Sequence, residues 1–406
     1  MKNYYTISQI ADIFSIPVKN INSKIENIEN FIVNSSGEKC FHYSQIEKLK
    51  NMNKEEWELF SMIKPKREYT SIELFTGAGG LALGLEKAGF NHIMLNEFNK
   101  NAVKTLKKNR PNWNIKDDDI SDLSFKEYKN KDIDLLSGGF PCQAFSYVGK
   151  GLGFADIRGT LFYHYARALS EIKPKFFIAE NVKGLLTHDN GKTIEVIYDK
   201  FKEQGYKVLP PKLFNCLYYK VPQKRERIII VGIREDIYNE NIEFQDPTMF
   251  YEILNLKDTF YKGELYNEDV PKSNIIKYSD KKENILKLVP MGGNWKDLPV
   301  EKQIEYLGDS FNKGGGKTGI ARRLSIDKPS LTLLCSPMQK QTERCHPTET
   351  RPLTIRESAR IQTFPDDWVF EGSILEQYKQ IGNAVPVNFA EIIGKSLINY
   401  MNKMVD

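Results

Sequence analysis

The residues best suited to covalent chemistry lie where an apolar segment runs into two glycines and a proline. The stretch reads Leu135-Leu136-Ser137-Gly138-Gly139-Phe140-Pro141-Cys142-Gln143. Because the proline fixes the chain just before Cys142, we expect the thiol on a defined but movable loop at the carboxyl edge of a sheet. A lone cysteine is most often a small buried hydrophobe, but these neighbours favour a nucleophile.

Two further segments carry groups suited to acid–base and anion-binding chemistry. Glu180 follows the apolar residues 176–179, where partial burial would let its carboxyl donate a proton near neutral pH. The alternative is a structural glutamate paired with a nearby lysine. Gln223, Arg225 and Arg227 alternate in an extended segment and therefore share one face. Two guanidinium forks on one face suit a carbonyl or phosphate oxygen, and the alternative is a solvated edge strand.

A glycine-rich turn and two acids predict a nucleoside pocket. Phe75-Thr76-Gly77-Ala78-Gly79-Gly80 joins the first strand to a helix, and its spacing is not the dinucleotide pattern Gly-x-Gly-x-x-Gly. Glycines there let a ligand approach the backbone closely, although a tight structural turn would look similar. Glu97 ends the second strand, suited to ribose hydroxyls, and Asp119 follows a third segment, suited to an adenine amine. Each acid alone would be a solvated residue, but successive strand ends favour a shared pocket.

The elements that must position these side chains alternate as in an α/β sheet. Residues 240–350 lose that rhythm and predict an irregular second domain, and helices return near the end of the chain. The expected strands are 71–75, 92–95, 132–136, 176–179 and 227–233, and the expected helices are 81–88, 99–108, 160–171, 193–204, 354–362 and 387–401.

Composition excludes several classes of protein. The 406 residues carry a formal charge of +5 and 40% hydrophobic residues, ordinary for a globular chain and compatible with nucleic-acid binding. The longest apolar runs are strand-sized, and the first ten residues resemble no secretory signal, so we expect a cytoplasmic protein without membrane contact. Five widely spaced cysteines disfavour a disulfide framework and a zinc site, and no metal is expected.

At this point the sequence resembles the bacterial DNA (cytosine-5)-methyltransferases of restriction–modification systems. The resemblance extends from about Thr70 to Val385. It includes the glycine-rich turn, Gly-Phe-Pro-Cys-Gln, Glu-Asn-Val and Gln-x-Arg-x-Arg in family order, and continues through Arg351-Pro352-Leu353-Thr354, 359–365 and Gln380-Ile381-Gly382-Asn383-Ala384-Val385-Pro386. Two departures are minor: Phe98 stands where the family often has Trp, and Asp118 where it often has Gly.

The resemblance implies a mechanism for four residues. Cys142 would add to carbon 6 of a flipped cytosine, which makes carbon 5 nucleophilic toward the methyl group of S-adenosylmethionine. Glu180 would protonate ring nitrogen 3. Arg227, supported by Arg225, would hold the exocyclic oxygen or the adjacent backbone. The base that removes the carbon-5 proton is not visible in the sequence.

The resemblance also implies the contacts of cofactor and DNA. Phe75 and Phe98 would flank adenine, Glu97 would bind the ribose, Asp119 would bind the adenine amine, and Leu161 and Asn383 would complete the pocket. Gln143, Ser146 and Arg158 match a loop that closes over DNA. The cofactor-binding set is Phe75, Gly77, Gly79, Gly80, Leu81, Glu97, Phe98, Asp119, Ile120, Pro141, Leu161 and Asn383.

The irregular region corresponds to the family's target recognition domain. Its segments Thr318-Gly319-Ile320-Ala321-Arg322-Arg323 and Gln339-Lys340-Gln341-Thr342-Glu343-Arg344 supply forks and amides for guanine edges or phosphates. We therefore expect DNA contacts from Arg322, Arg323, Gln339, Gln341 and Arg344. Arg356 and Arg360, on a helix opened by a Thr354–Glu357 capping box, are expected to brace the two domains.

The first 63 residues resemble winged helix-turn-helix modules. Apolar Ala11, Ile16, Ile21 and Ile25 suit a helix, a turn and a second helix that Pro17 starts. Accessory DNA binding, including binding of the protein's own promoter, is one interpretation; a stability or dimer element is the other.

The expected architecture is therefore a Rossmann-like S-adenosylmethionine-dependent methyltransferase sheet with an irregular recognition domain and an N-terminal helical module. The boundaries are 1–63, linker 64–70, catalytic domain 71–240, recognition domain 241–350 and a catalytic completion at 351–406. We expect a monomer on duplex DNA. The alternatives are a transfer-RNA cytosine methyltransferase, disfavoured by the long recognition region, and an inactive regulator, disfavoured by the intact Cys142, Glu180, Arg225 and Arg227.

Overall fold

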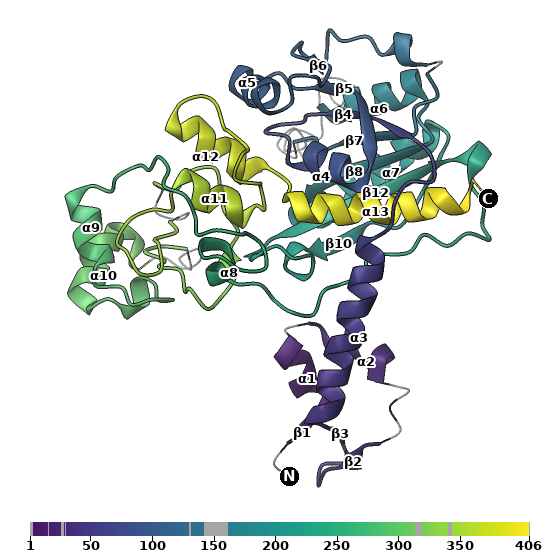
Figure 1. Ribbon diagram of the computed structural model, residues 1–406. Coiled ribbons are helices and arrows are strands. Elements are labelled where there is room, and N and C mark those ends of the chain that lie inside the picture. The colour runs from purple at the N-terminus through teal and green to yellow at the C-terminus, as the bar shows by residue number, and fades with distance from the viewer. Residues whose placement is uncertain are drawn as a thin grey trace.

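In the computed structural model, the described residues form a central mixed sheet of eight strands (Figure 1). The description covers residues 3–14, 16–25, 28, 30–129, 131–141, 161–312, 319–339 and 343–405. The strand order is β10-β12-β8-β7-β4-β5-β6, with β9 also paired to β12. The strands are β4 (Tyr69–Leu74), β5 (Phe90–Asn96), β6 (Ile115–Lys116), β7 (Leu135–Gly138), β8 (Phe176–Val182), β9 (Tyr206–Val208), β10 (Lys212–Asn215) and β12 (Glu226–Arg234).

The middle of this sheet is parallel and buried. β7 pairs in parallel with β4 and β8, and β5 pairs in parallel with β4 and β6, whereas β12 runs antiparallel to β8. All four residues of β7 and six of the seven in β8 are buried, as expected for strands covered on both faces. Polar side chains of these strands therefore reach solvent or a ligand mainly at the strand ends.

Helices that are far apart in the sequence pack together on the sheet (Figure 1). α13 packs against α4 so closely that a Cβ at Gly84 would lie 2.3 Å from the Cβ of Ala390, which is why glycine is needed there. The last helix thus contacts the helix that follows β4, the first strand of the sheet. The helices are α4 (Gly80–Ala88), α5 (Lys100–Asn109), α6 (Leu161–Ile172), α7 (Lys192–Glu203), α11 (Ile355–Ile361), α12 (Ile374–Asn383) and α13 (Val387–Lys403).

The region around residues 240–350, called the recognition region after its predicted role, has few regular elements, as the sequence predicts. Its short helices are α8 (Leu256–Phe260), α9 (Asp280–Leu286) and α10 (Val300–Leu307). A two-stranded parallel sheet joins β13 (Ser330–Leu331) to β11 (Gln223–Lys224), just before β12. The chain therefore returns from the recognition region directly beside the Gln-x-Arg-x-Arg segment.

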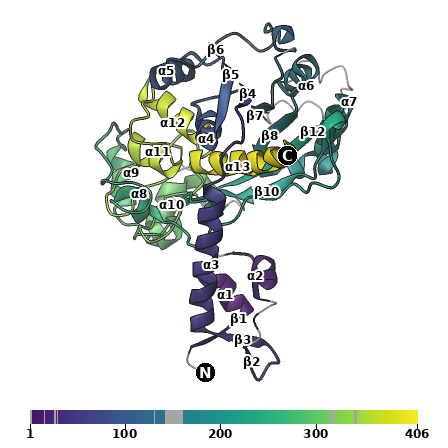
Figure 2. The same cartoon turned by 45° about the vertical axis from the view of Figure 1, so that its right-hand side comes forward.

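The N-terminal module stands apart from the sheet and is joined to it through α3, as two views agree (Figures 1 and 2). Among the described residues it contains a three-stranded antiparallel sheet and three helices. The buried Asn53 of α3 fixes it to the body, because its side chain donates to the carbonyl of Met249 and accepts from the amide of Tyr251. The elements are β1 (Tyr4–Thr6), α1 (Ile7–Phe14), α2 (Val18–Ile25), β2 (Ile32–Val33), β3 (Lys39–His42) and α3 (Tyr43–Ser61).

Two expectations about elements need correction. The strand expected over 176–179 continues to Val182, so Glu180 lies inside β8 rather than after it, because β12 extends the hydrogen-bonded ladder as far as Val182. Helix α12 was not expected. It depends on a Ser373 N-cap, whose side chain accepts from the amide of Glu376. In the part of the chain that the structure describes, no helix is long and apolar enough to cross a membrane.

Candidate active site and recognition region

A cavity of about 960 Å³ opens at the carboxyl ends of β4, β5, β7 and β8. Helix α12 contributes its other wall through Gln380, Gly382 and Asn383. The topology explains the convergence, because parallel strands end at one edge of the sheet. Predicted cofactor residues on this lining are Phe75, Gly77, Leu81, Glu97, Phe98, Asp119, Ile120, Pro141, Leu161 and Asn383.

The glycine-rich turn contacts the cavity only through its first half. Phe75 and Gly77 both have positive φ, 58° and 59°, and the Gly77 amide donates to Glu97 Oε2 at 2.7 Å. Gly79 and Gly80 are not among the residues that line the cavity, and their assignment as cofactor residues stays a prediction. A Cβ at Gly79 would meet Leu106 and Trp368, and one at Gly80 would lie 2.2 Å from the Val385 carbonyl oxygen. These two glycines allow close packing of the turn.

The two acids predicted for the nucleoside are held differently. Glu97 accepts one backbone amide on each oxygen, from Gly77 and from Asn99, both at 2.7 Å. Burial nevertheless raises the pKa of Glu97. Asp119 Oδ1 accepts hydrogen bonds from the amide and the hydroxyl of Ser121. The hydrogen bond from the amide is the main cause that lowers the pKa of Asp119. Both carboxyls keep acceptor capacity for hydroxyl or amine donors of a ligand.

The catalytic end of the cavity contains an ion pair. Arg227 Nε lies 2.7 Å from Glu180 Oε1, and both side chains are nearly buried, with 11% and 12% exposed. A Cβ at Gly139 would lie 2.6 Å from Glu180 Oε2. Gly139, three residues before Cys142 in the sequence, thus lies directly against this carboxylate.

Asn181 connects the same strand to the cysteine-bearing segment. Its side-chain amide donates to the Phe140 carbonyl at 2.9 Å, so β8 holds the chain two residues before Cys142. Cys142 itself, with Gln143, Ser146 and Arg158, lies outside the described residues. Their assignments therefore stay predictions.

Arg225 faces the cavity but is occupied by backbone oxygens. Its side chain donates to the carbonyls of Leu333, Gly382 and Ala384 at 2.9–3.1 Å, and the residue is 1% exposed. Burial, followed by repulsion from Arg227, lowers the pKa of Arg225 to about 9. The two arginines of this segment therefore have different partners. Arg227 pairs with Glu180, whereas Arg225 donates to backbone carbonyls.

Two arginines that were predicted to contact DNA, Arg323 and Arg344, are buried in the structure. Arg323 is 5% exposed and donates to the carbonyls of Leu286, Val289, His346 and Glu349 and to the Thr350 hydroxyl. With its donors used inside the fold, Arg323 is a structural residue. Arg344 is 9% exposed, and burial lowers its pKa to about 10.

Two other residues that were predicted to contact DNA, Arg322 and Gln339, are more accessible than Arg323. Arg322 is half-buried and donates to the Gly292 carbonyl at 3.2 Å, while Gln339 is exposed. Gln341 lies outside the described residues.

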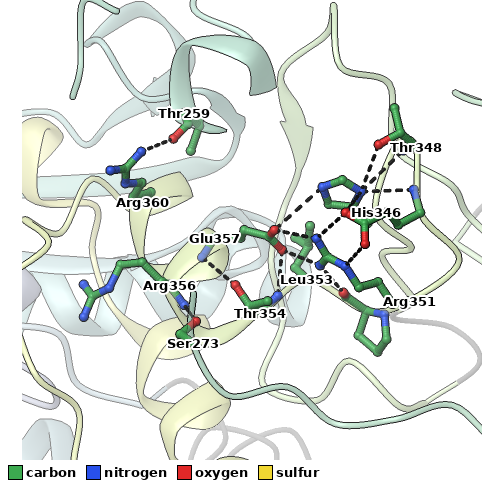
Figure 3. A network of polar contacts seen from close by, with 12 residues as sticks. Thr259, Ser273, His346, Thr348, Arg351, Leu353, Thr354, Arg356, Glu357 and Arg360 are labelled. Atoms are coloured by element: carbon green, nitrogen blue, oxygen red, sulfur yellow. Dashed lines mark hydrogen bonds and ion pairs between the residues drawn. The ribbon is translucent and has the colours of Figure 1, made fainter. Parts of the chain in front are cut away.

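A polar network joins the recognition region to α11 (Figure 3). Arg351 forms a two-pronged ion pair with Glu357, with both contacts at 2.8 Å, and Glu357 completes the predicted capping box with Thr354. Arg360, fully buried, donates to the Thr259 carbonyl at 2.9 Å. The Arg356 backbone amide donates to the Ser273 hydroxyl. The predicted bracing role is confirmed for Arg360, whereas the Arg356 side chain donates to Pro365 and Trp368 and therefore holds the C-terminal part itself together.

Two of the cavity-lining polar residues that the sequence did not indicate have a buried atom without a partner. Glu73 Oε1 and Thr76 Oγ1 are both buried without a hydrogen-bond partner among the described residues. Burial raises the pKa of Glu73 to about 8. Its signal in the sequence was a single acid inside the apolar strand. Unpaired buried polar atoms are costly, so their presence beside the cavity fits a polar ligand such as the zwitterionic end of S-adenosylmethionine.

A comparison with family models decides the class of protein. Residues 69–399 match the model for the C-5 cytosine-specific DNA methylases. The chain belongs to this family. It is a DNA (cytosine-5)-methyltransferase, and the matched range contains the sheet, the cavity and the recognition region described above.

Curated relatives match over nearly the full length of the methyltransferase. It is 50% identical over 410 residues to the Type II methyltransferase M.Eco47II of Escherichia coli, covering 100% of this chain and 97% of that protein. It is 53% identical over 348 residues to M.Sau96I of Staphylococcus aureus, covering 84% and 79%. A solved structure titled as a putative DNA modification methyltransferase encoded within a prophage of E. coli is 25% identical, with a TM-score of 0.59, covering 82% of this chain and 100% of that one.

Proposed function

We propose that this methyltransferase is the protective methylase of a restriction–modification system, methylating carbon 5 of a flipped cytosine within a short duplex sequence. The observation that carries the proposal is the Glu180–Arg227 pair, with 2.7 Å between Nε and Oε1, at one end of the cavity that Phe75, Glu97 and Asn383 line. The names of the Type II relatives support the restriction–modification setting.

The cavity residues divide into a cofactor end and a base end. S-adenosylmethionine, when bound, supplies the methyl group. Phe75 and Phe98 would flank the adenine, and Phe98 is 65% exposed and so available to stack on a ring. Glu97 would accept from the ribose hydroxyls and Asp119 from the adenine amine.

At the base end, the residues would act on the cytosine ring. The Cys142 thiolate would add to carbon 6, while Glu180 hydrogen-bonds and protonates nitrogen 3, so that electron density moves toward carbon 5. Arg227 is already bonded to Glu180 and would orient that carboxyl while binding the exocyclic oxygen. After methyl transfer, loss of the carbon-5 proton lets the thiolate leave by elimination. The duplex must be opened for this chemistry, which costs a few kcal/mol.

The experiment follows methyl transfer and the covalent bond separately. Labelled methyl groups from S-adenosylmethionine should enter duplex DNA and not transfer RNA. DNA with 5-fluorocytosine at the target should form an adduct that survives denaturing electrophoresis, because no proton can be removed from carbon 5. Efficient transfer to RNA, or turnover by Cys142→Ala, would contradict the proposal. Bisulfite sequencing of DNA from expressing cells would map the target sequence.

We also propose accessory DNA binding through the N-terminal module, with the protein's own promoter as the candidate target. Support comes from the order α1–turn–α2 followed by the β2–β3 hairpin, and from Lys19 and Asn22, exposed on α2. The module differs from strongly basic DNA-binding domains, because residues 1–63 contain seven Lys, no Arg and eight Asp or Glu. Lys24 is also paired with Glu56, at 2.6 Å. Any DNA contact would therefore depend on few cations.

A further inference from the structure

The segment that returns from the recognition region forms part of the wall of the cofactor cavity. Leu334 and Cys335 lie three and four residues after the end of β13, and both line the cavity together with Asn383. Cys335 Sγ donates to Asn383 Oδ1 at 2.8 Å. A molecule that fills this end of the cavity therefore contacts the return segment, residues 333–335, as well as the catalytic domain.

The return segment lies backbone to backbone against the end of helix α12, which carries Asn383. A Cβ at Gly382 would lie 2.6 Å from the Leu334 carbonyl carbon and 2.8 Å from the Cys335 nitrogen. Such contact leaves no room for a side chain, so a shift of one segment displaces the other.

Buried polar side chains fasten these two segments together. Arg225 donates to Leu333 on one side and to Gly382 and Ala384 on the other. Gln223 accepts from the Leu333 amide at 2.9 Å and donates to Gln362 Oε1 at 3.0 Å. Gln362 in turn donates to the Ile381 carbonyl at 2.7 Å. Arg225, Gln223 and Gln362 form what we call the clamp.

We propose that Arg225 is a positioning residue: through the clamp it links filling of the cofactor cavity to the placement of the recognition region, so that cofactor and DNA each strengthen binding of the other. The inference rests on the proposed function, because it takes S-adenosylmethionine or its product as the cavity ligand. Arg225 acts on backbone oxygens rather than on the cytosine. Because the linkage is thermodynamic, the effect of cofactor on DNA affinity must equal the effect of DNA on cofactor affinity.

The test measures the dissociation constant of a duplex containing a mapped methylation site, with and without S-adenosylhomocysteine. Wild-type protein should bind the duplex about 10-fold more tightly with S-adenosylhomocysteine, within the usual range of coupling. Arg225→Lys keeps the charge but cannot span three carbonyls, so the ratio should fall below about 2-fold. The matched control is Arg356→Lys, since Arg356 also donates to two buried carbonyls, of Pro365 and Trp368, but does not contact the return segment.

The outcomes separate this inference from the proposed function. If S-adenosylhomocysteine fails to bind the wild type, the proposed function fails. If it binds but leaves DNA affinity unchanged, or if Arg225→Lys couples as the wild type does, only the clamp is overturned. Should Arg225→Lys not fold, hydrogen exchange in wild-type protein decides: S-adenosylhomocysteine should slow exchange of the Leu333 amide, and an unchanged rate would reject the proposal.

Discussion

The buried carboxyls of the cofactor cavity and the buried Arg323 of the recognition region have different kinds of partners. Around the cavity, buried or half-buried carboxyls such as Glu73, Glu97 and Glu180 gather at strand ends, with acceptor capacity directed at a ligand. In the recognition region, Arg323 donates its N–H groups to backbone carbonyls of the same region. The difference follows from regular structure, because a sheet satisfies its own backbone and leaves side chains for chemistry.

Among its described residues, the irregular region has little such pairing beyond β13, so most of its carbonyls need other donors. An arginine supplies up to five N–H groups in one plane and can satisfy several carbonyls at once. A basic residue in an irregular recognition region is therefore not evidence of DNA contact by itself. The four predictions below test this contrast, from the largest expected effect to the smallest.

Removing the ion pair at the base end should have the largest effect. Arg227→Ala and Glu180→Gln should each lower kcat for DNA methylation by about 10²–10⁴-fold, the size typical of lost acid–base or electrostatic catalysis. Steady-state methyl transfer with a saturating duplex provides the measurement. Melting temperatures serve as the control, and a variant with wild-type kcat would remove Glu180 or Arg227 from the mechanism.

Neighbouring arginines in the recognition region should differ sharply. Arg323→Met leaves several buried carbonyls without donors, so unfolding free energy should fall by about 3–5 kcal/mol. Arg322→Met should change stability far less and instead weaken DNA binding. Urea unfolding and a DNA-binding titration on both variants distinguish the two roles. Equal stability of the two proteins would contradict the structural assignment of Arg323.

Glu73 should make stability depend on pH. Burial raises its pKa in the folded protein to about 8, above the usual value near 4.3 in an unfolded chain. Between these values the unfolded state loses the proton first, so stability falls as pH rises, and the loss is complete above about pH 8. Glu73→Gln cannot ionise, so its stability relative to wild type should increase between pH 5 and pH 8.5. The measurement is thermal unfolding of both proteins at pH 5 and at pH 8.5. If the difference in stability between the two proteins is the same at both pH values, the pKa of Glu73 is not raised by folding.

The N-terminal module should show the smallest effect. Lys19→Glu should weaken binding of the upstream DNA of its own gene several-fold and leave methylation of a short duplex unchanged. Lys24→Glu is the matched comparison, because Lys24 is paired with Glu56 and its loss should chiefly affect the module. Gel-shift titration at fixed salt tests both. Equal binding by wild type and Lys19→Glu would favour the stability or dimer interpretation.

Local sequence was sufficient to predict many of the regular elements and several cavity residues that follow strands of the sheet. Phe75, Glu97 and Asp119 were identifiable because each follows a strand, and parallel strands end at one edge. It was also sufficient for the α11 capping box, whose residues are three apart. Glu180 was predicted to be an active-site acid, but its place within β8 depends on pairing with β12, a contact between segments about fifty residues apart.

Only the tertiary structure decided what the arginines and the last two glycines of the turn do. Gly80 meets Val385, Arg225 joins Leu333 to Gly382, and Arg323 reaches Leu286, all contacts between distant parts of the chain. A residue type and its spacing determine which chemistry a side chain can perform. Whether its hydrogen-bonding groups remain available for a ligand depends on which backbone oxygens the fold brings within about 3 Å, and neighbouring residues do not determine that.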